Sequence, residues 1–249
     1  MSQPATHRPS RSDLSDAAAR PAIKTTVDLA FADEKFAPPI VSATAIPRTR
    51  LRDLLLRAGP GELVVLTGPP GAGKTTLIAQ TAVRIAQPDR TTWIGLDAHD
   101  GDPAVFWATL THGLGPASAG RVRVDARPPR ADDIDRAAPQ IARRIATAEQ
   151  TGLLVLDGGE HLADASAAVL ARLLRAAPPG LRIVLATRHA VPAELNRLRL
   201  LGRVLDVDAD LLAFTAAEAA EMWNTAGRAL PPTEATALIG RTGGLAVAV

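Results

Sequence analysis

The chain contains the stretch Glu62-Leu-Val-Val-Leu-Thr67, which runs directly into Gly68-Pro-Pro-Gly-Ala-Gly-Lys74-Thr75. The first part is an apolar run of strand length, and the second matches the pattern G-x-x-x-x-G-K-[ST] at every fixed position. We therefore expect a strand, a glycine-rich loop and a helix that begins near Lys74.

The spacing of this loop suits phosphate binding. Gly68, Gly71 and Gly73 let the backbone curl so that successive N–H groups point at an anion, which the following helix dipole also attracts. Lys74 would bring positive charge to the β- and γ-phosphates, and Thr75 would bring a hydroxyl to Mg²⁺. A glycine- and proline-rich connector that matches by chance is the alternative, and the strand–loop–helix order argues against it. The residues expected to contact ATP or ADP here are Gly68, Pro69, Pro70, Gly71, Ala72, Gly73, Lys74, Thr75 and Thr76.

Composition narrows the class of protein. The chain has 249 residues, of which 47% are hydrophobic and 22% charged, so it can bury a core of one large domain. A formal net charge of +2 is too small to indicate nucleic acid binding by itself. Without cysteine, disulfides and thiolate metal sites are excluded. Residues 1–22 lack the apolar core of a signal peptide, and no apolar run approaches the ~18 residues that span a membrane, so we expect a cytoplasmic protein without membrane contact.

The chain divides into three parts by pattern. Residues 1–34 are rich in Ser, Pro, Ala and charge, and are predicted to form a disordered tail. Residues 35–212 alternate apolar strands with helices, which predicts a parallel sheet covered on both faces. Residues 213–249 are helical in pattern, and we expect them to begin a small helical subdomain that is incomplete in this chain. The predicted strands are Glu62–Thr67, Thr92–Asp97, Gly152–Asp157, Leu181–Thr187 and Val204–Val207, and the predicted helices are 51–58, 74–86, 103–114, 132–148, 164–176, 215–226 and 232–241.

Two acidic residues are candidates for the nucleotide site. Asp157 ends the buried strand Gly152–Asp157 and is the candidate carboxylate for orienting hydrated Mg²⁺. Many enzymes of this kind place another acid next to it to polarise water, but Gly158 stands there. Glu160 is then the candidate base, although capping of the following helix is an equal alternative. Binding is therefore the safer expectation, and hydrolysis is expected to be slow.

The predicted fold is a three-layer α/β P-loop NTPase with strand order 5-1-4-3-2. In that order the fourth strand, which ends at Thr187-Arg188, lies between the strands that lead to Lys74 and Asp157. Because ligands bind beyond the carboxyl ends of parallel strands, Arg188 would face the terminal phosphate. A solvated surface cation is the alternative. Asp97, Asp100 and Asp102 could assist magnesium, but helix capping before Pro103 is the favoured interpretation.

Several further segments occur in a fixed order. They are Phe36–Pro39 with Pro47–Leu51, Gly68–Thr76, Trp93–Trp107, Leu154–Leu162, Ala186–Arg188, Leu212–Glu218 and Gly243–Ala248. Together they resemble the STAND class of signal-transduction ATPases, in particular the nucleotide-binding domain of large LuxR-type transcriptional activators of the maltose-activator kind. The resemblance runs from about residue 35 to the end.

The resemblance implies a switch that rests with ADP and self-associates with ATP. It also implies that Ile46–Arg50, with Arg48 and Arg50, lies against the adenine and ribose. Gly158 and Ala246 depart from the wider class, which often has an acid and a proline there. The family's winged helix, sensor repeats and helix-turn-helix do not follow in this chain, so we expect no direct DNA binding from it. The functions left open are a slow ATPase switch, a binding-only nucleotide module, and another P-loop enzyme such as a kinase, which the lack of an evident acceptor lid disfavours.

Overall fold

The fold is built on a parallel sheet whose strands run in the order β3-β5-β6-β2-β7. The computed structural model describes residues 26–30, 33–59, 61–86, 90–114, 121–125, 128–137, 152–176 and 180–248. Its sheet consists of β2 (Leu63–Thr67), β3 (Thr91–Gly95), β5 (Gly152–Asp157), β6 (Leu181–Thr187) and β7 (Val204–Val207). This is the predicted order 5-1-4-3-2, numbered from the other edge.

The register brings the functional strands to a common edge. Thr67 pairs with Thr187, and Asp157 pairs with Ala186 on one side and Gly95 on the other. Since all neighbouring strands are parallel, their carboxyl ends meet along one side of the sheet, where the loops that follow them lie close together.

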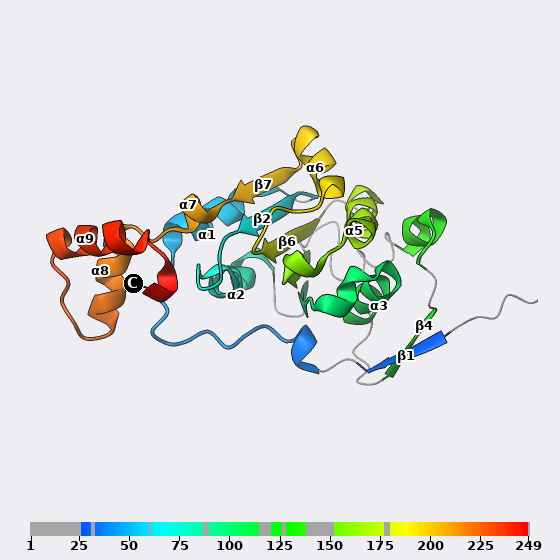
Figure 1. Ribbon diagram of the computed structural model, residues 1–249, viewed down its shortest axis with the longest axis horizontal. Coiled ribbons are helices and arrows are strands. Elements are labelled where there is room, and N and C mark those ends of the chain that lie inside the picture. The colour runs from blue at the N-terminus through cyan, green and yellow to red at the C-terminus, as the bar shows by residue number, and fades with distance from the viewer. Residues whose placement is uncertain are drawn as a thin grey trace, which may run out of the picture.

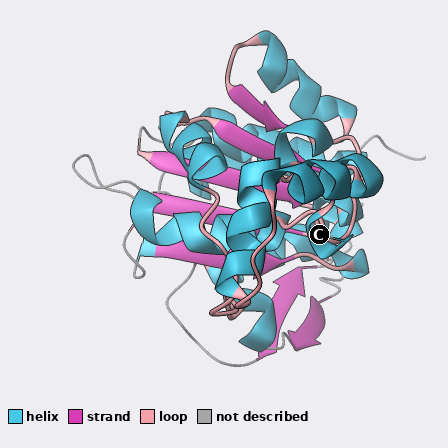
Figure 2. Cartoon of the chain, turned by 90° about the vertical axis from the view of Figure 1, so that its left-hand side faces the viewer, coloured by secondary structure: helices cyan, strands magenta, loops and turns pink. Residues whose placement is uncertain are grey.

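Helices cover both faces of the sheet. Figure 2 shows the strands running side by side with helices around them. The helical segments are η1 (Asp33–Phe36), α1 (Thr49–Arg57), α2 (Lys74–Ile85), η3 (Ala98–Gly101), α3 (Pro103–Gly113), η4 (Gly159–His161), α5 (Asp164–Ala176), α6 (Ala193–Leu200), α7 (Ala209–Leu212), α8 (Ala216–Thr225), α9 (Pro232–Thr242) and η5 (Ala246–Ala248). Within the described residues, none of these helices is long and apolar enough to cross a membrane.

Alternating strand residues feed two separate cores, which makes the fold three-layered. On β5, Leu154 and Leu156 face a core that contains residues of α3, α5 and α6. Their neighbours Leu153 and Val155 face the other core, which contains residues of α1 and α2. Burial of each strand on both faces explains why these strands are apolar throughout and do not alternate with polar residues.

A small antiparallel sheet corrects one prediction from the sequence. β1 (Thr26–Ala30) pairs with β4 (Arg121–Asp125), so residues 26–30 do not belong to a disordered tail. Both segments alternate polar and apolar residues. Each is short and its partner is distant in sequence, so the pattern alone does not predict their pairing. Residues 1–25 and 31–32 of that tail lie outside the described residues, and residues 33 and 34 belong to the helical turn η1. Most of the predicted helix 132–148 also lies outside them, and the described helix there spans residues 131–137.

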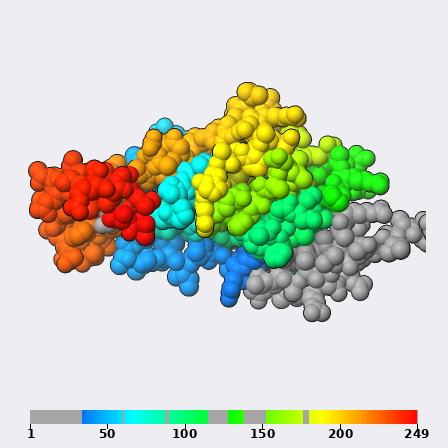
Figure 3. All heavy atoms as spheres, viewed as in Figure 1, coloured from blue at the N-terminus to red at the C-terminus, as the bar shows by residue number. Residues whose placement is uncertain are grey.

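Helices α8 and α9 lie at one end of the molecule, opposite β1 and β4 (Figure 1). As predicted, Thr215 and Glu218 form a capping box that starts α8. The chain then returns toward the sheet, and Figure 3 shows its last residues (red) against the region around α2 (cyan). This return places η5 beside the glycine-rich loop.

Candidate nucleotide-binding site

The glycine-rich loop adopts the backbone shape that the motif requires. β2 ends at Thr67 and α2 begins at Lys74, as predicted. Gly71 has φ 79° and Gly73 has φ 82°, in the left-handed region that favours glycine. The loop is tied to the adjacent strand because the N–H of Gly68 donates to the carbonyl of Thr187 over 3.2 Å. The N-terminal turn of α2 therefore opens toward the carboxyl edge of the sheet.

Lys74 lies within the curl of this loop. Its Nζ donates to the carbonyl of Gly68 over 2.6 Å and to that of Pro69 over 3.0 Å. Burial lowers the pKa of this amine below its ordinary value, although Glu160 and Asp157 act in the opposite direction. A phosphate group would supply the anionic partner that compensates for this burial.

Thr75 and Asp157 meet at the carboxyl edge of the sheet. Thr75 Oγ1 donates to Asp157 Oδ2 over 2.8 Å, although the two residues come from α2 and β5. Burial raises the pKa of Asp157, against the hydrogen bond from Thr75 and the charge of Lys74. A hydroxyl and a carboxylate oxygen side by side are ligands that Mg²⁺ prefers, so the donor set fits the expected ion.

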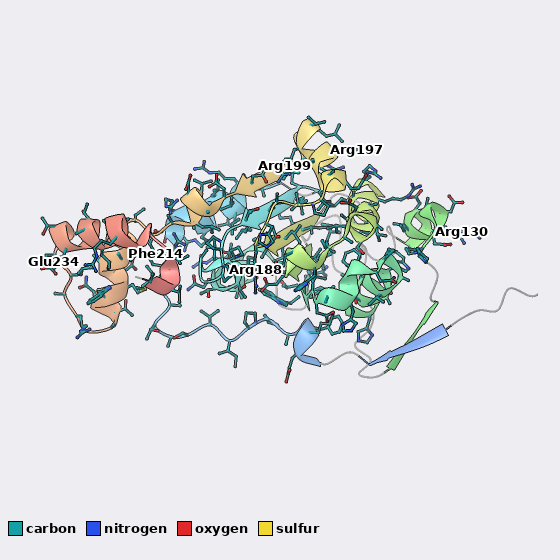
Figure 4. The ribbon with its side chains drawn as sticks, viewed as in Figure 1. Arg130, Arg188, Arg197, Arg199, Phe214 and Glu234 are labelled. Carbon is teal, nitrogen blue, oxygen red and sulfur yellow. The ribbon has the colours of Figure 1, made fainter. Side chains whose placement is uncertain are left out.

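Glu160 and Arg188 form an ion pair at the same edge. Arg188 Nε lies 2.8 Å from Glu160 Oε1, and the Arg188 N–H donates to Glu160 Oε2 over 3.2 Å. The side chain of Arg188 is 55% exposed whereas that of Glu160 is 14% exposed, so the arginine is freer to move. Figure 4 places Arg188 beside α2.

Gly158 cannot be replaced by an acid without disturbing the site. Its φ is 95°, and a Cβ added to it would lie 2.6 Å from the carbonyl oxygen of Leu96. An acid at this position would therefore strain the backbone and collide with a neighbouring strand end. Glu160, two residues further on, is the acid that joins Asp157 in lining the cavity among the residues that the structure describes.

These side chains surround a cavity of about 520 Å³ at the carboxyl edge of the sheet. Its lining comprises Pro70, Gly71, Gly73, Lys74, Thr75, Thr76, Gly95, Leu96, Asp157, Gly158, Glu160, His161, Ala186 and Arg188. The structure thus brings together most of the residues that the sequence suggested for phosphate and magnesium, while Gly68, Pro69 and Ala72 do not line this cavity. His161 and Leu96 were not foreseen, although both follow strands that end at this edge.

The acids Asp97, Asp100 and Asp102 do not line this cavity. Asp97 caps η3, and Asp102 caps α3 by accepting from the Ala104 N–H over 2.7 Å. Asp100 is fully buried and accepts from Lys35 and Thr109. The capping interpretation is confirmed for Asp97 and Asp102. Among the described residues, no group of three or more His, Cys, Asp or Glu could hold a metal ion.

A second cavity, of about 280 Å³, lies on the other side of the loop. Its walls are Pro69, Ala72, Ala209, Asp210, Leu212, Ala213, Thr242, Gly243, Gly244 and Leu245. The loop residues Pro69 and Ala72 join it to the phosphate site. Sequence reasoning placed Pro69 and Ala72 at the nucleotide but missed the other walls. One signal was present: residues 209–213 follow the strand next to β2, so they had to emerge beside the loop.

Arg48 and Arg50 line neither of these two cavities. Arg48 is 4% exposed and donates to backbone carbonyls of Leu212 and Ala213. Arg50 also donates to the Ala213 carbonyl, over 3.1 Å. A direct contact of either arginine with the nucleotide stays a prediction.

Comparison with known proteins identifies the family. Residues 47–186 match the model of the AAA ATPase domain. The chain belongs to this family. Membership implies nucleotide binding and agrees with the geometry of the loop.

Curated relatives confirm the resemblance predicted from the sequence. The chain is 28% identical over 194 residues to the HTH-type transcriptional regulator MalT of Serratia proteamaculans. This alignment covers 76% of this chain and 21% of that protein. It is 26% identical over 226 residues to the serine/threonine-protein kinase PknK of Mycobacterium tuberculosis. That alignment covers 86% of this chain and 20% of that protein. The chain spans about a fifth of the length of these relatives.

A solved structure shares the fold. It is a signal transduction ATPase with numerous domains (STAND) protein with a tetratricopeptide repeat sensor, from Pyrococcus horikoshii. The TM-score is 0.51 with 16% sequence identity, and the match covers 84% of this chain and 30% of that chain. At this level of identity the likeness supports the P-loop fold and nothing finer.

Proposed function

We propose that this chain is the ATP-dependent switch domain of a STAND-type regulator and that it hydrolyses ATP slowly. The observation that carries the proposal is the meeting of Thr75 and Asp157, 2.8 Å apart, in a cavity that Lys74 also lines. A phosphate loop, an ammonium group and a magnesium carboxylate on one edge are the parts that bind a nucleoside triphosphate.

Each residue has a distinct task in this proposal. The amides of the glycine-rich loop and Lys74 would hold the β- and γ-phosphates, while Thr75 and Asp157 would hold Mg²⁺. The bound ion neutralises charge on the phosphates. The base would enter the second cavity, since Pro69 and Ala72 connect it to the loop. Arg188 would turn toward the terminal phosphate and release Glu160 to accept a proton from water.

Nucleotide exchange would carry the regulatory signal. ADP would hold the resting form, and ATP would favour self-association. The residues 246–248 touch the loop through the Val247 N–H, which donates to the Gly71 carbonyl over 3.1 Å, so a change in the loop would be transmitted to the C-terminal turn. We propose that DNA recognition is not a task of the residues in this chain, whose net charge is only +2.

A second candidate function is nucleotide binding without turnover. Two observations favour it: Gly158 has no room for an acid, and Arg188 holds the carboxylate of Glu160 with two contacts. A glutamate whose two carboxylate oxygens are both held by Arg188 is not free to contact an attacking water.

Single-turnover hydrolysis of MgATP separates the two candidates. The switch proposal predicts slow hydrolysis by the wild type and a loss of roughly tenfold or more in Glu160→Gln, with MgATP still bound. Glu194→Gln is the matched control, because Glu194 also pairs with an arginine, Arg197, but lies on α6 away from the cavity. Wild-type turnover equal to that of a protein-free sample would support binding only.

Self-association is tested separately by light scattering after size-exclusion chromatography. The proposal predicts a larger mass with ATP than with ADP when hydrolysis is blocked by Glu160→Gln. The same mass with both nucleotides would contradict the switch, while leaving nucleotide binding intact.

A further inference from the structure

A buried arginine in the segment before α1 binds residues 212–214, here called the hinge, which connect the sheet to helices α8 and α9. Arg48 immediately precedes α1, and its side chain is 4% exposed. Its Nη1 donates to the Leu212 carbonyl over 2.7 Å, and its Nη2 donates to the Ala213 carbonyl over 2.9 Å. Burial lowers the pKa of the guanidinium, but Glu218 supports its charged form.

The remaining faces of Arg48 are also occupied. Nη2 donates to Glu218 Oε2 over 3.1 Å, and the guanidinium carbon lies 4.2 Å from the centre of the Phe214 ring. Burial would raise the pKa of Glu218, but hydrogen bonds from the Thr215 N–H and from Arg48 outweigh it and keep the pKa below its ordinary value. Arg48 thus makes directed contacts to three consecutive hinge residues, 212 to 214, and to the first turn of α8.

Two of the residues that Arg48 contacts also line the second cavity. Leu212 and Ala213 line that cavity, so Arg48 binds the backbone of two of its lining residues. The next residue, Phe214, donates its N–H to the carbonyl of Gly244, which also lines the cavity, over 2.8 Å. A Cβ on Gly244 would come within 2.8 Å of the Phe214 carbonyl oxygen, so the two walls approach closely there. Figure 4 shows Phe214 at this junction between the helical end and the sheet.

We propose that Arg48 is a positioning residue for the base of the nucleotide. It sets the separation of the cavity walls by holding the hinge at residues 212–214, and it does so without touching the nucleotide. This role replaces the direct contact with adenine that the resemblance suggests for Arg48, and it rests on the proposed function. A planar base needs a slot of defined width, whereas the phosphates are held by the loop and do not depend on the hinge.

The physical reason lies in the cost of removing the donor that these groups share. Loss of the guanidinium would leave the Leu212 carbonyl without this donor. The Ala213 carbonyl would keep Arg50 and the Glu218 carboxylate would keep the Thr215 N–H, but both would lose the contact that ties them to Leu212. Buried acceptors of this kind gain by turning toward water, so the hinge would shift and the cavity would change shape. A lysine would restore the charge but not the fork that reaches two carbonyls and a carboxylate at once.

Two ligands separate an effect on the base from an effect on the phosphates. We would measure by calorimetry the affinity of the full chain for ATP and for inorganic tripolyphosphate, both with Mg²⁺. Arg48→Lys is expected to weaken ATP binding about tenfold and to leave tripolyphosphate within about twofold of the wild type. Glu218→Gln, which keeps the arginine and removes the charge of its partner, should shift ATP affinity in the same direction by a smaller factor.

Arg52→Lys is the matched control, because Arg52 lies on α1 and pairs with its neighbour Asp53 rather than with the hinge. Its affinities for both ligands should equal those of the wild type. Equal losses for ATP and tripolyphosphate in Arg48→Lys, or no loss for ATP, would overturn the positioning role. Failure of the wild type to bind ATP would instead contradict the proposed function.

Discussion

Replacing Gly71 by alanine perturbs the glycine-rich loop at two points that can be measured separately. The first is the backbone, because Gly71 has φ 79°, where L-residues are strained. The second is a contact with the C-terminal turn: an added Cβ would lie 2.5 Å from Val247 Cγ1 and 2.8 Å from Val247 Cβ. The substitution therefore tests both the shape of the loop and its contact with η5.

The expected cost follows from these two terms. The left-handed conformation costs an alanine about 1–2 kcal/mol. Val247 is 75% exposed, so the turn can move away, but it then loses the hydrogen bond from the Val247 N–H to the Gly71 carbonyl, which contributes about 1 kcal/mol. The free energy of unfolding should fall by about 2–3 kcal/mol in total, which corresponds to a decrease in Tm of about 4–12 °C. ATP affinity should fall about tenfold or more, because the loop amides no longer converge.

Urea denaturation of the protein without nucleotide measures the stability term, and calorimetry measures ATP affinity. Gly227→Ala is the control, since Gly227 has φ 77° but nothing lies within 4 Å of an added Cβ. It should cost about 1–2 kcal/mol and leave ATP affinity unchanged. In a chain that carries Val247→Gly, the cost of Gly71→Ala should fall toward that of the control. An equal cost in both backgrounds would refute the contact between the loop and the turn.

Three further changes test other parts of the site. Asp157→Asn removes a buried carboxylate whose pKa is raised by burial, so the Tm of the nucleotide-free protein should rise. The same change should remove the Mg²⁺-dependent part of ATP binding, and a lower Tm would contradict the assignment of burial as the cause. Gly158→Asp, which restores the acid common in the family, should lower Tm and fail to speed hydrolysis, because its Cβ would meet the Leu96 carbonyl; faster turnover in a stable protein would show this steric argument to be wrong. Asp97, beside Lys35, has a pKa lowered to about 2, below the ~3.9 of the unfolded chain, so its contribution to stability is present above about pH 4 and is lost as pH falls toward 2. In urea titrations the difference between wild type and Asp97→Asn should shrink over that range, and a constant difference would exclude this ionisation as its source.

The parts of the structure that could be predicted share a physical origin. The phosphate loop is a local pattern, in which the left-handed backbone and the following helix require particular residues at fixed spacing. The strands and the position of Asp157 follow from apolar runs that must be buried on both faces of a parallel sheet, and the strand order comes from the P-loop fold that the motif indicates. Such constraints act on short stretches of chain, so they are visible in the sequence.

The parts that could not be predicted depend on contacts between distant segments. Arg48 and Leu212 are 164 positions apart, and no local pattern indicates that one would donate to the other. The pairing of β1 with β4 has the same character, since each strand is short and its partner is remote. The second cavity forms only when the hinge and the C-terminal turn both return to the loop, so its walls belong to no single motif.

Calorimetric titration of the chain with MgATP shows whether the glycine-rich loop holds a nucleotide. We expect saturable binding at a single site and a loss of affinity of about 100-fold in Lys74→Ala, since a buried charge-assisted contact to phosphate is removed. Arg84→Ala, which removes an exposed cation from the same helix, should bind as the wild type does. Absence of binding by the wild type, or equal affinity in Lys74→Ala, would contradict the assignment of this loop as the nucleotide site.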